Sequence, residues 1–131
     1  MNAHNLWGTL PGTDEIKPPA AILREQATRL SDLTNHVLEG RVRTIREGEH
    51  IVNFLDIVAP ALQGYTFTVL EIKHGIEFYP LWYKSITANG SPASYQECQT
   101  EEAFLANLKA ILSSHEIRKV ITSLLAQSKV Q

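Results

Sequence analysis

The sequence has a single cysteine and no long hydrophobic run, and each shortage narrows what the chain can be. Because Cys98 stands alone, an intramolecular disulfide is impossible and a zinc cluster built on cysteines cannot form. No stretch approaches the roughly 18 consecutive apolar residues of a membrane-spanning helix, and the amino end lacks the basic-then-apolar order of a signal peptide. We therefore expect a cytoplasmic chain without a membrane segment.

The sequence also has no large excess of positive or negative residues, because the formal net charge is only -2. This balance gives no global attraction to nucleic acid or to an anionic membrane, so neither is an expected partner. With 131 residues, of which 44% are hydrophobic and 20% charged, the chain has the size and composition of one globular domain.

Motifs for metals, cofactors and catalysis are missing as well. The histidines stand at positions 4, 36, 50, 74 and 115, and no two have the spacing of zinc ligands. Glu71, His74 and His50 would form a metal site only if the strands happened to bring them together. Cys98 would need a base such as His115 to act as a nucleophile, so an inert thiol is the simpler interpretation. The glycines are typical of turns rather than of a nucleotide-binding loop, and we expect no cofactor and no metal.

Residues 1–17 predict an extended N-terminal arm, because glycine and proline interrupt a polar stretch without helical or strand period. Several of its side chains are too apolar for a free tail, so part of the arm is expected to lie in a groove of its own domain or of a neighbour. These are Leu6, Trp7, Leu10 and Ile16. Residues 18–131 are expected to form a single domain.

A long helix is predicted directly after the arm. Pro18 and Pro19 are typical of a first helical turn, and Gly40 suits the left-handed position that ends a helix. Between them, apolar residues recur at steps of three and four and define one buried face. They are Ile22, Leu23, Ala27, Leu30, Leu33, Val37 and Leu38.

The centre of the chain changes to a strand period. We expect antiparallel strands over residues 41–47, 50–59, 65–73 and 76–86, with a short fifth strand over 95–99. Glycine and proline between these segments indicate short turns and hence a meander. Pro80 cannot donate a hydrogen bond to a neighbouring strand, so it predicts an edge, a bulge or a bend in the fourth strand.

The carboxyl-terminal part returns to helical spacing. Thr100 is suited to cap a helix whose buried side is Phe104, Leu105, Leu108, Ile111 and Leu112. Ser113 with Glu116 forms a capping box for a second helix, although a single helix over 101–127 is the alternative. The predicted fold is therefore α+β: a four- to five-stranded antiparallel meander sheet packed by a long N-terminal helix and two C-terminal helices.

The segment 76–86 is unusual because its apolar residues fall on both faces of the predicted strand. One face has Ile76, Phe78, Trp82 and Ile86, and the other has Tyr79, Leu81 and Tyr83. Since the helices can cover only one face, the aromatic segment needs a second cover. We therefore expect a partner or a ligand to contact Phe78, Tyr79, Leu81, Trp82 and Tyr83.

Two charged residues in the predicted strands are candidate polar anchors. Asp56 interrupts an apolar run, where a carboxylate must be paired, exposed or protonated. The favoured interpretation is a structural pair with Arg43 of the neighbouring strand, and the alternative is a polar group in a pocket lined by Tyr79, Trp82 or Tyr83. Arg41, Arg43 and Arg46 could meet phosphates, but interleaved acidic residues favour a solvated face.

Three functions are compatible with these patterns. The first is a non-catalytic protein-interaction module, such as an adaptor, a chaperone-like factor or a small regulatory subunit, which self-associates through its aromatic sheet face. The second is a small-molecule sensor with a pocket lined by Phe78, Tyr79, Trp82 and Tyr83. An enzyme comes third, because no nucleophile, base and orienting group can be assembled from local sequence. The expected partner is a protein or a second copy of the chain, as a homodimer.

Overall fold

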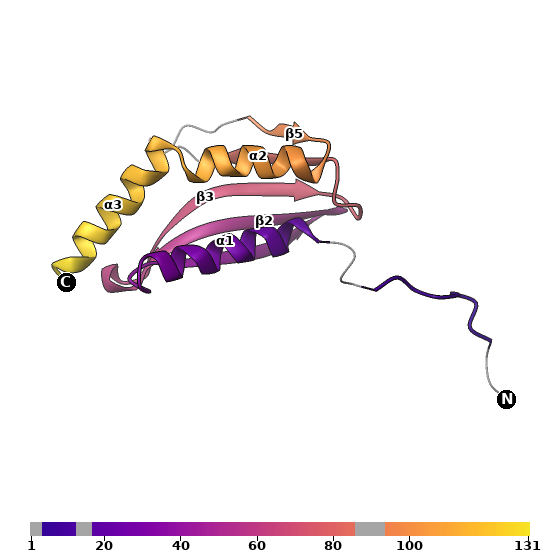
Figure 1. The fold of residues 1–131 in the computed structure, drawn as a ribbon, viewed down its shortest axis with the longest axis horizontal. Helices are drawn as coiled ribbons and strands as arrows, with labels where there is room; N and C mark the ends of the chain where they lie inside the picture. The colour runs from indigo at the N-terminus through magenta and orange to yellow at the C-terminus, as the bar shows by residue number, and fades with distance from the viewer. Residues whose placement is uncertain (1–3, 13–16, 86–93) are drawn as a thin grey trace.

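Five antiparallel strands form one sheet in the order β1-β2-β3-β4-β5, and the computed structural model describes residues 4–12, 17–85 and 94–131 (Figure 1). The elements are α1 (Pro19–Leu33), β1 (Glu39–Glu47), β2 (His50–Ala59), the short 3-10 helix η2 (Pro60–Leu62), β3 (Tyr65–His74), β4 (Leu81–Ser85), β5 (Gln96–Cys98), α2 (Glu101–Leu112) and α3 (His115–Lys129). The predicted α+β fold is confirmed, including the meander, the N-terminal helix and the two C-terminal helices.

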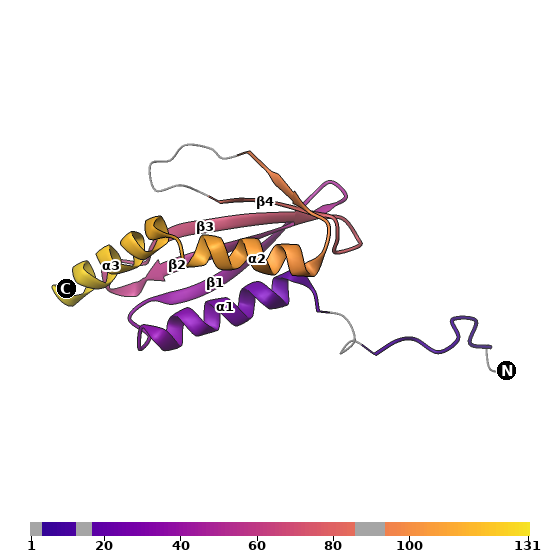
Figure 2. The same ribbon diagram turned by 45° about the horizontal axis from the view of Figure 1, so that its top comes forward.

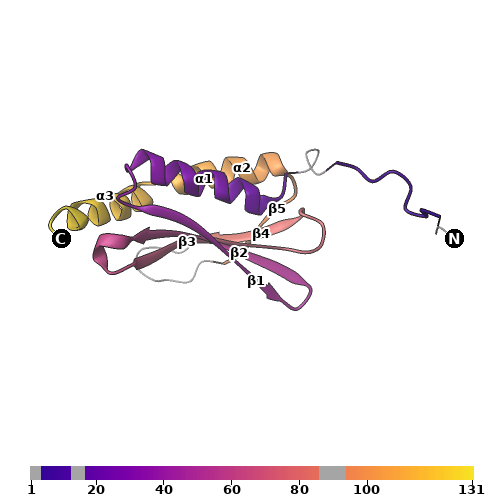
Figure 3. The same cartoon turned by 90° about the horizontal axis from the view of Figure 1, so that it is seen from below.

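All the helices lie on one face of the sheet, so the domain has two layers (Figure 3). Strand alternation directs one set of side chains from every strand toward the helices, where they form a single core. Its strand residues include Leu55, Ile57, Leu70, Ile72 and Leu81, and its helix residues include Ile22, Leu23, Phe104, Leu108, Ile117 and Leu124. The α1 helix packs mainly on β1 and β2, whereas α2 contacts β5 and α3.

The first helix is shorter than predicted. It ends at Leu33, because Asn35 and His36 adopt left-handed φ values of 51° and 64°. The Thr34 hydroxyl holds this reversal, since it donates to the Leu30 carbonyl at 3.0 Å and accepts from the Leu38 N–H at 3.2 Å. The prediction that the helix ends at Gly40 is therefore wrong, and Gly40 lies in β1.

The fourth strand is also shorter than predicted. The segment 75–80 connects β3 to β4 outside any strand, and it contains the cis peptide bond Tyr79–Pro80. The bend predicted at Pro80 is confirmed, but β4 is not an edge strand, because β5 pairs with it. Ile76 is 93% exposed in this connection, and Ile86 lies outside the described residues.

The C-terminal segment forms two helices rather than one. The Thr100 hydroxyl accepts from the Ala103 N–H at 3.1 Å, which confirms the predicted cap of α2. The cap of α3 is Ser114, whose hydroxyl accepts from the Ile117 N–H at 3.3 Å, so the capping box placed at Ser113 was wrong by one residue. Among the described helices, none is long and apolar enough to cross a membrane.

The described part of the arm, residues 4–12, extends away from the domain (Figure 1). Its apolar side chains Leu6, Trp7 and Leu10 are exposed, so their predicted placement in a groove of their own domain is wrong. Ile16 lies outside the described residues. The alternative placement, in a groove of a neighbouring molecule, stays a prediction.

Candidate functional site

The predicted aromatic face is divided between the two sides of the sheet. Leu81 and Tyr83 point toward the helices and belong to the core, with exposed fractions of 0% and 8%. Trp82 has the opposite parity in β4 and lies on the face away from the helices. Burial leaves little of Leu81 or Tyr83 for a partner to contact. Because Trp82 and Tyr83 point to opposite faces of the sheet, one pocket cannot be lined by both.

Phe78 and Tyr79 lie in the connection before β4 and belong to the domain's own packing. Phe78 meets the His74 ring edge to face, with 5.8 Å between ring centroids. Tyr79 packs against the core, and its hydroxyl has no hydrogen-bond partner among the described residues. Burial, with a smaller contribution from the Glu101 charge, raises the pKa of Tyr79 to about 12.

Asp56 forms the structural pair with Arg43 that the sequence favours. Its side chain is buried, whereas the Arg43 guanidinium reaches it from a half-exposed position. The Thr68 hydroxyl donates a second hydrogen bond to Asp56 Oδ1 at 2.8 Å. The Arg43 guanidinium also lies 4.4 Å from the centroid of the Phe54 ring. Asp56 and Tyr83 lie on opposite faces of the sheet, so Tyr83 cannot line a pocket with Asp56. Trp82 lies on the same face as Asp56, and a pocket that both would line stays a prediction.

Ion pairs cross the sheet face that points away from the helices. Lys73 of β3 binds Glu47 of β1 at 3.0 Å and thereby covers Val52, which lies between them in β2 and is buried. Glu71 binds Lys84 at 3.2 Å and accepts a hydrogen bond from the Tyr95 hydroxyl at 2.8 Å. Glu47, Lys73, Glu71 and Lys84 are thus engaged in ion pairs on this face.

The residues considered as a nucleophile or as metal ligands also contact neighbouring groups in the domain. Cys98 is buried, and burial raises the pKa of its thiol, although a hydrogen bond from Asn107 acts in the opposite direction. Glu71 and His74 point to opposite faces of β3, and the His74 Nδ1 lies 2.7 Å from the Gly75 carbonyl. In the ranges that the structure describes, no three His, Cys, Asp or Glu side chains are grouped to hold a metal ion.

The basic residues of β1 make short local contacts. Arg41 pairs with Glu39 at 2.9 Å, and Arg46 donates to the Gly48 carbonyl at 3.0 Å. With Arg43 bound to Asp56, each of the three arginines has a partner within the sheet or its first turn. These contacts agree with the interpretation of a solvated face rather than with a phosphate-binding site.

A groove with an apolar lining lies between α1 and the junction of α2 with α3. Its narrow part has a volume of about 170 Å³, with Leu30 and Leu33 on the α1 side and Leu112 and Ile121 on the other side. Leu55, Ile57 and Val69 of the sheet also line it. Figures 1 and 2 show α1 and α2 as separate ridges on the sheet, with strands visible between them.

A wider part of about 520 Å³ continues this groove along α2. It shares Gln26, Leu112 and Ile121 with the narrow part and adds Leu105 and Leu108. Leu33 is 80% exposed and Leu105 is 43% exposed, so the groove is bordered by apolar side chains that the domain does not bury. We call the two parts together the interhelical groove.

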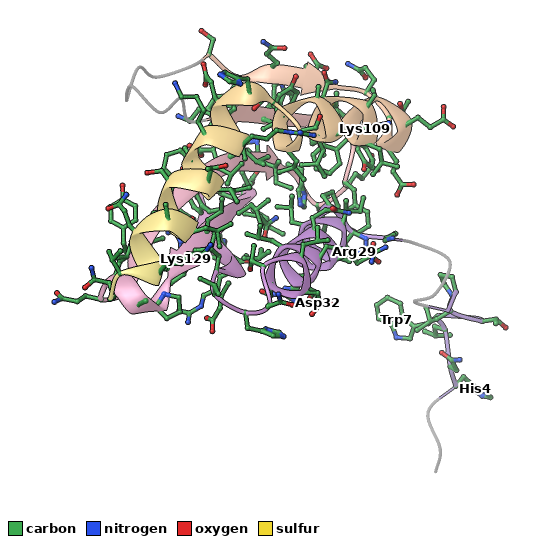
Figure 4. The ribbon with its side chains drawn as sticks, turned by 60° about the vertical axis from the view of Figure 1, so that its left-hand side comes forward. His4, Trp7, Arg29, Asp32, Lys109 and Lys129 are labelled. Carbon is green, nitrogen blue, oxygen red and sulfur yellow. The ribbon has the colours of Figure 1, made fainter. Side chains whose placement is uncertain are left out.

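The lining of the interhelical groove is positively charged at its rim. Arg29 comes from α1, Lys109 from α2 and Arg118 from α3, and Figure 4 shows Arg29 and Lys109 on their separate helices. The ion pairs formed among the described residues involve none of these three. Asp56 is also among the lining residues, but its carboxylate pairs with Arg43 on the opposite face of the sheet. An acidic and apolar segment would therefore complement this surface.

A second hollow of about 580 Å³ lies between η2, the start of β3 and α3. Leu62, Tyr65 and Phe67 line one side, but α3 contributes mainly charged and amide side chains, including Glu116, Lys119 and Gln127. Water can satisfy such a lining, so this hollow needs no partner.

Sequence reasoning identified the residues of the interhelical groove but assigned them to the core. Leu33 and Leu105 fit the apolar stripes of their helices, yet both remain exposed. The available signal was the width of the α2 stripe, where Phe104 and Leu105 are adjacent and cannot both point toward the sheet.

Comparison with known proteins finds no matching family model, no matching curated protein and no matching solved structure.

Proposed function

We propose that the chain is a non-catalytic protein-interaction module whose binding surface is the interhelical groove. The observation that carries this proposal is the combination of exposed leucines along the groove with a basic rim formed by residues of three helices. Exposed apolar patches bordered by polar residues are typical of interaction sites. The proposed ligand is a peptide segment that has apolar anchors and acidic flanking residues.

This proposal moves the expected interface from the aromatic sheet face to the helical layer. Leu81 and Tyr83 are already covered, and ion pairs occupy much of the outer sheet face around Trp82. Leu33, by contrast, has no cover among the described residues, and burying such a side chain contributes about 1.5–3 kcal/mol.

A binding role accounts for the candidate catalytic groups better than an enzymatic one. Asp56, Glu71 and Cys98 each bond to a neighbouring side chain within the domain, which is a structural use of a polar group. A cytoplasmic location, expected from the sequence, belongs to the same proposal.

Methyl NMR of the full chain with a panel of short peptides tests the proposed surface. Peptides with two or more apolar residues and flanking acidic residues should shift the methyl signals of Leu30, Leu33, Leu112 and Ile121. Leu33→Ser should weaken this binding. Ile76→Ser is the control, because Ile76 is also an exposed apolar residue but lines neither part of the groove.

Shifts that centre on the Trp82 indole would instead support the outer sheet face. The absence of any shift with acidic, basic and neutral peptides would contradict the proposed function. Replacing Arg29 by glutamate provides a further check, because it should weaken acidic peptides and strengthen basic ones.

A further inference from the structure

We infer that the occupant of the interhelical groove is the N-terminal arm of a second copy of this chain, so that two copies exchange arms reciprocally. This inference rests on the proposed function, because it names the partner of the same groove. The chain has an exposed apolar segment and an unfilled apolar groove, and reciprocal exchange would satisfy both at once. A symmetric dimer that uses the same patches twice is the commonest form of association.

The arm has the chemistry that the groove requires. Leu6, Trp7 and Leu10 are exposed by 91%, 83% and 68%, so their apolar surface is uncovered in a single copy. The next part of the arm contains Asp14 and Glu15, which carry the charge opposite to that of Arg29, Lys109 and Arg118 at the rim. Apolar anchors followed by acidic residues thus match an apolar groove with a basic rim.

The arm also has local order around its main anchor. The Trp7 N–H donates to Asn5 Oδ1 at 3.0 Å, and Asn5 Nδ2 donates to the Gly8 carbonyl at 3.1 Å. Gly8 has a φ of 70°, which a glycine adopts without the strain of a side chain. This turn presents Leu6 and Trp7 in a defined conformation, which lowers the entropy that docking would cost.

The geometry at the start of α1 favours a groove in another molecule. Pro18 has φ of -63° and ψ of 149°, an extended conformation fixed by its ring and by the following Pro19. The arm joins α1 at the N-terminal end of the helix, whereas Leu30 and Leu33 of the narrow part of the groove lie at its C-terminal end. Figure 4 shows Trp7 standing away from the domain and from the helices that form the groove.

Sedimentation equilibrium of the full chain over a wide concentration range tests the exchange. The wild type should form a dimer, and Trp7→Ser and Leu33→Ser should each raise its dissociation constant by roughly tenfold or more, as expected for a central anchor. Both residues are exposed in a single copy, so neither change should disturb the fold. Ile76→Ser is the control and should leave the dimer unchanged.

Mixing the two weakened variants gives a sharper test. Trp7→Ser keeps an intact groove, and Leu33→Ser keeps an intact arm, so their heterodimer retains one complete contact while each homodimer has none. The mixture should therefore associate more strongly than either variant alone. Equal association of the mixture and the separate variants would overturn the reciprocal exchange.

Other outcomes would also overturn the inference. A wild type that stays monomeric at every concentration excludes exchange, and a dimer unaffected by Trp7→Ser and Leu33→Ser must use another surface. If other acidic peptides still shift the groove methyls in either case, the proposed function survives and only the identity of its partner is wrong. If no peptide shifts them, the proposed function itself has failed.

Discussion

Gly40 of β1 lies directly against Ala27 of α1, so that a Cβ atom on Gly40 would be 2.5 Å from the Ala27 Cα. No side chain separates the two backbones at this point. Because Gly40 has no positive φ, its role here is close packing rather than an unusual backbone conformation. The contact sets the distance between α1 and the sheet, and α1 forms one wall of the interhelical groove.

Replacing Gly40 by alanine should therefore destabilise the domain. An overpacked core contact of this kind costs about 1–3 kcal/mol, because helix and strand must move apart. Denaturant unfolding should show a lower midpoint for Gly40→Ala. The matched control is Gly75→Ala, since a Cβ on Gly75 meets no atom within 4 Å. Equal stability of the two variants would contradict the close approach.

The pair of Arg43 and Asp56 predicts an asymmetric response to substitution. Arg43→Met leaves a buried carboxylate with only the Thr68 hydroxyl for support, whereas Asp56→Asn leaves a half-exposed guanidinium that water can hydrate. We expect Arg43→Met to cost about 1–3 kcal/mol of unfolding free energy and the double variant to recover part of that loss. A double-mutant cycle measured by urea unfolding checks this. Additive effects would show that the two side chains do not interact.

Tyr79 predicts a loss of stability at alkaline pH. Burial raises the pKa of Tyr79 from 10.0 to about 12, so the folded state holds the phenolic proton at a pH where the unfolded chain releases it. The contribution of this group to stability is complete below about pH 10 and declines as the pH rises toward 12. Tyr79→Phe should reduce the slope of unfolding free energy against pH in this range.

The same substitution should cost little at neutral pH. The Tyr79 hydroxyl is buried without a hydrogen-bond partner among the described residues, so removing it leaves no other group unsatisfied. Some alkaline slope should remain, because burial and the hydrogen bond to Glu71 also raise the pKa of Tyr95 to about 12. An unchanged slope in Tyr79→Phe would contradict the burial of its hydroxyl.

The junction of α2 and α3 depends on Ser114 rather than on its neighbour. Ser114→Ala removes the hydroxyl that accepts from the Ile117 N–H and should cost about 0.5–2 kcal/mol of unfolding free energy. Ser113→Ala should have a smaller effect, because the Ser113 hydroxyl is exposed and bonds back to the Lys109 carbonyl. Thermal unfolding of both variants compares the two positions, and a larger effect at Ser113 would refute this assignment.

Local chemistry was sufficient to predict most of the fold. Thr100 caps α2 through a residue three positions along the chain, and the turn residues connect strands that are consecutive in sequence. Both effects could therefore be inferred without tertiary information. The end of α1 was harder, because Val37 and Leu38 continue the helical spacing after the helix has ended. Leu38 lies in the chain reversal that follows α1, and its side chain is buried in the core. Its apolar character therefore reflects burial in the core rather than a continuing helix.

The candidate site depended on information that no short segment contains. The alternation that separates Trp82 from Tyr83 was visible in the sequence, but which of the two faces the helices cover was not. The interhelical groove exists because α1 packs mainly on β1 and β2 while α2 contacts β5 and α3. That separation is a tertiary property, so residues such as Leu33 fit the pattern of a core helix and are nevertheless exposed.

The most direct test of the proposed arm exchange at the interhelical groove is intermolecular paramagnetic broadening. A spin label can be attached through Thr9→Cys in the arm, because Cys98 is buried and Thr9 is exposed. The labelled chain is then mixed with isotope-labelled wild type that carries no spin label. We predict that the methyl signals of Leu33, Leu112 and Ile121 broaden in the wild-type chain. Broadening centred on the Trp82 indole, or no broadening beyond that caused by free spin label, would contradict the account.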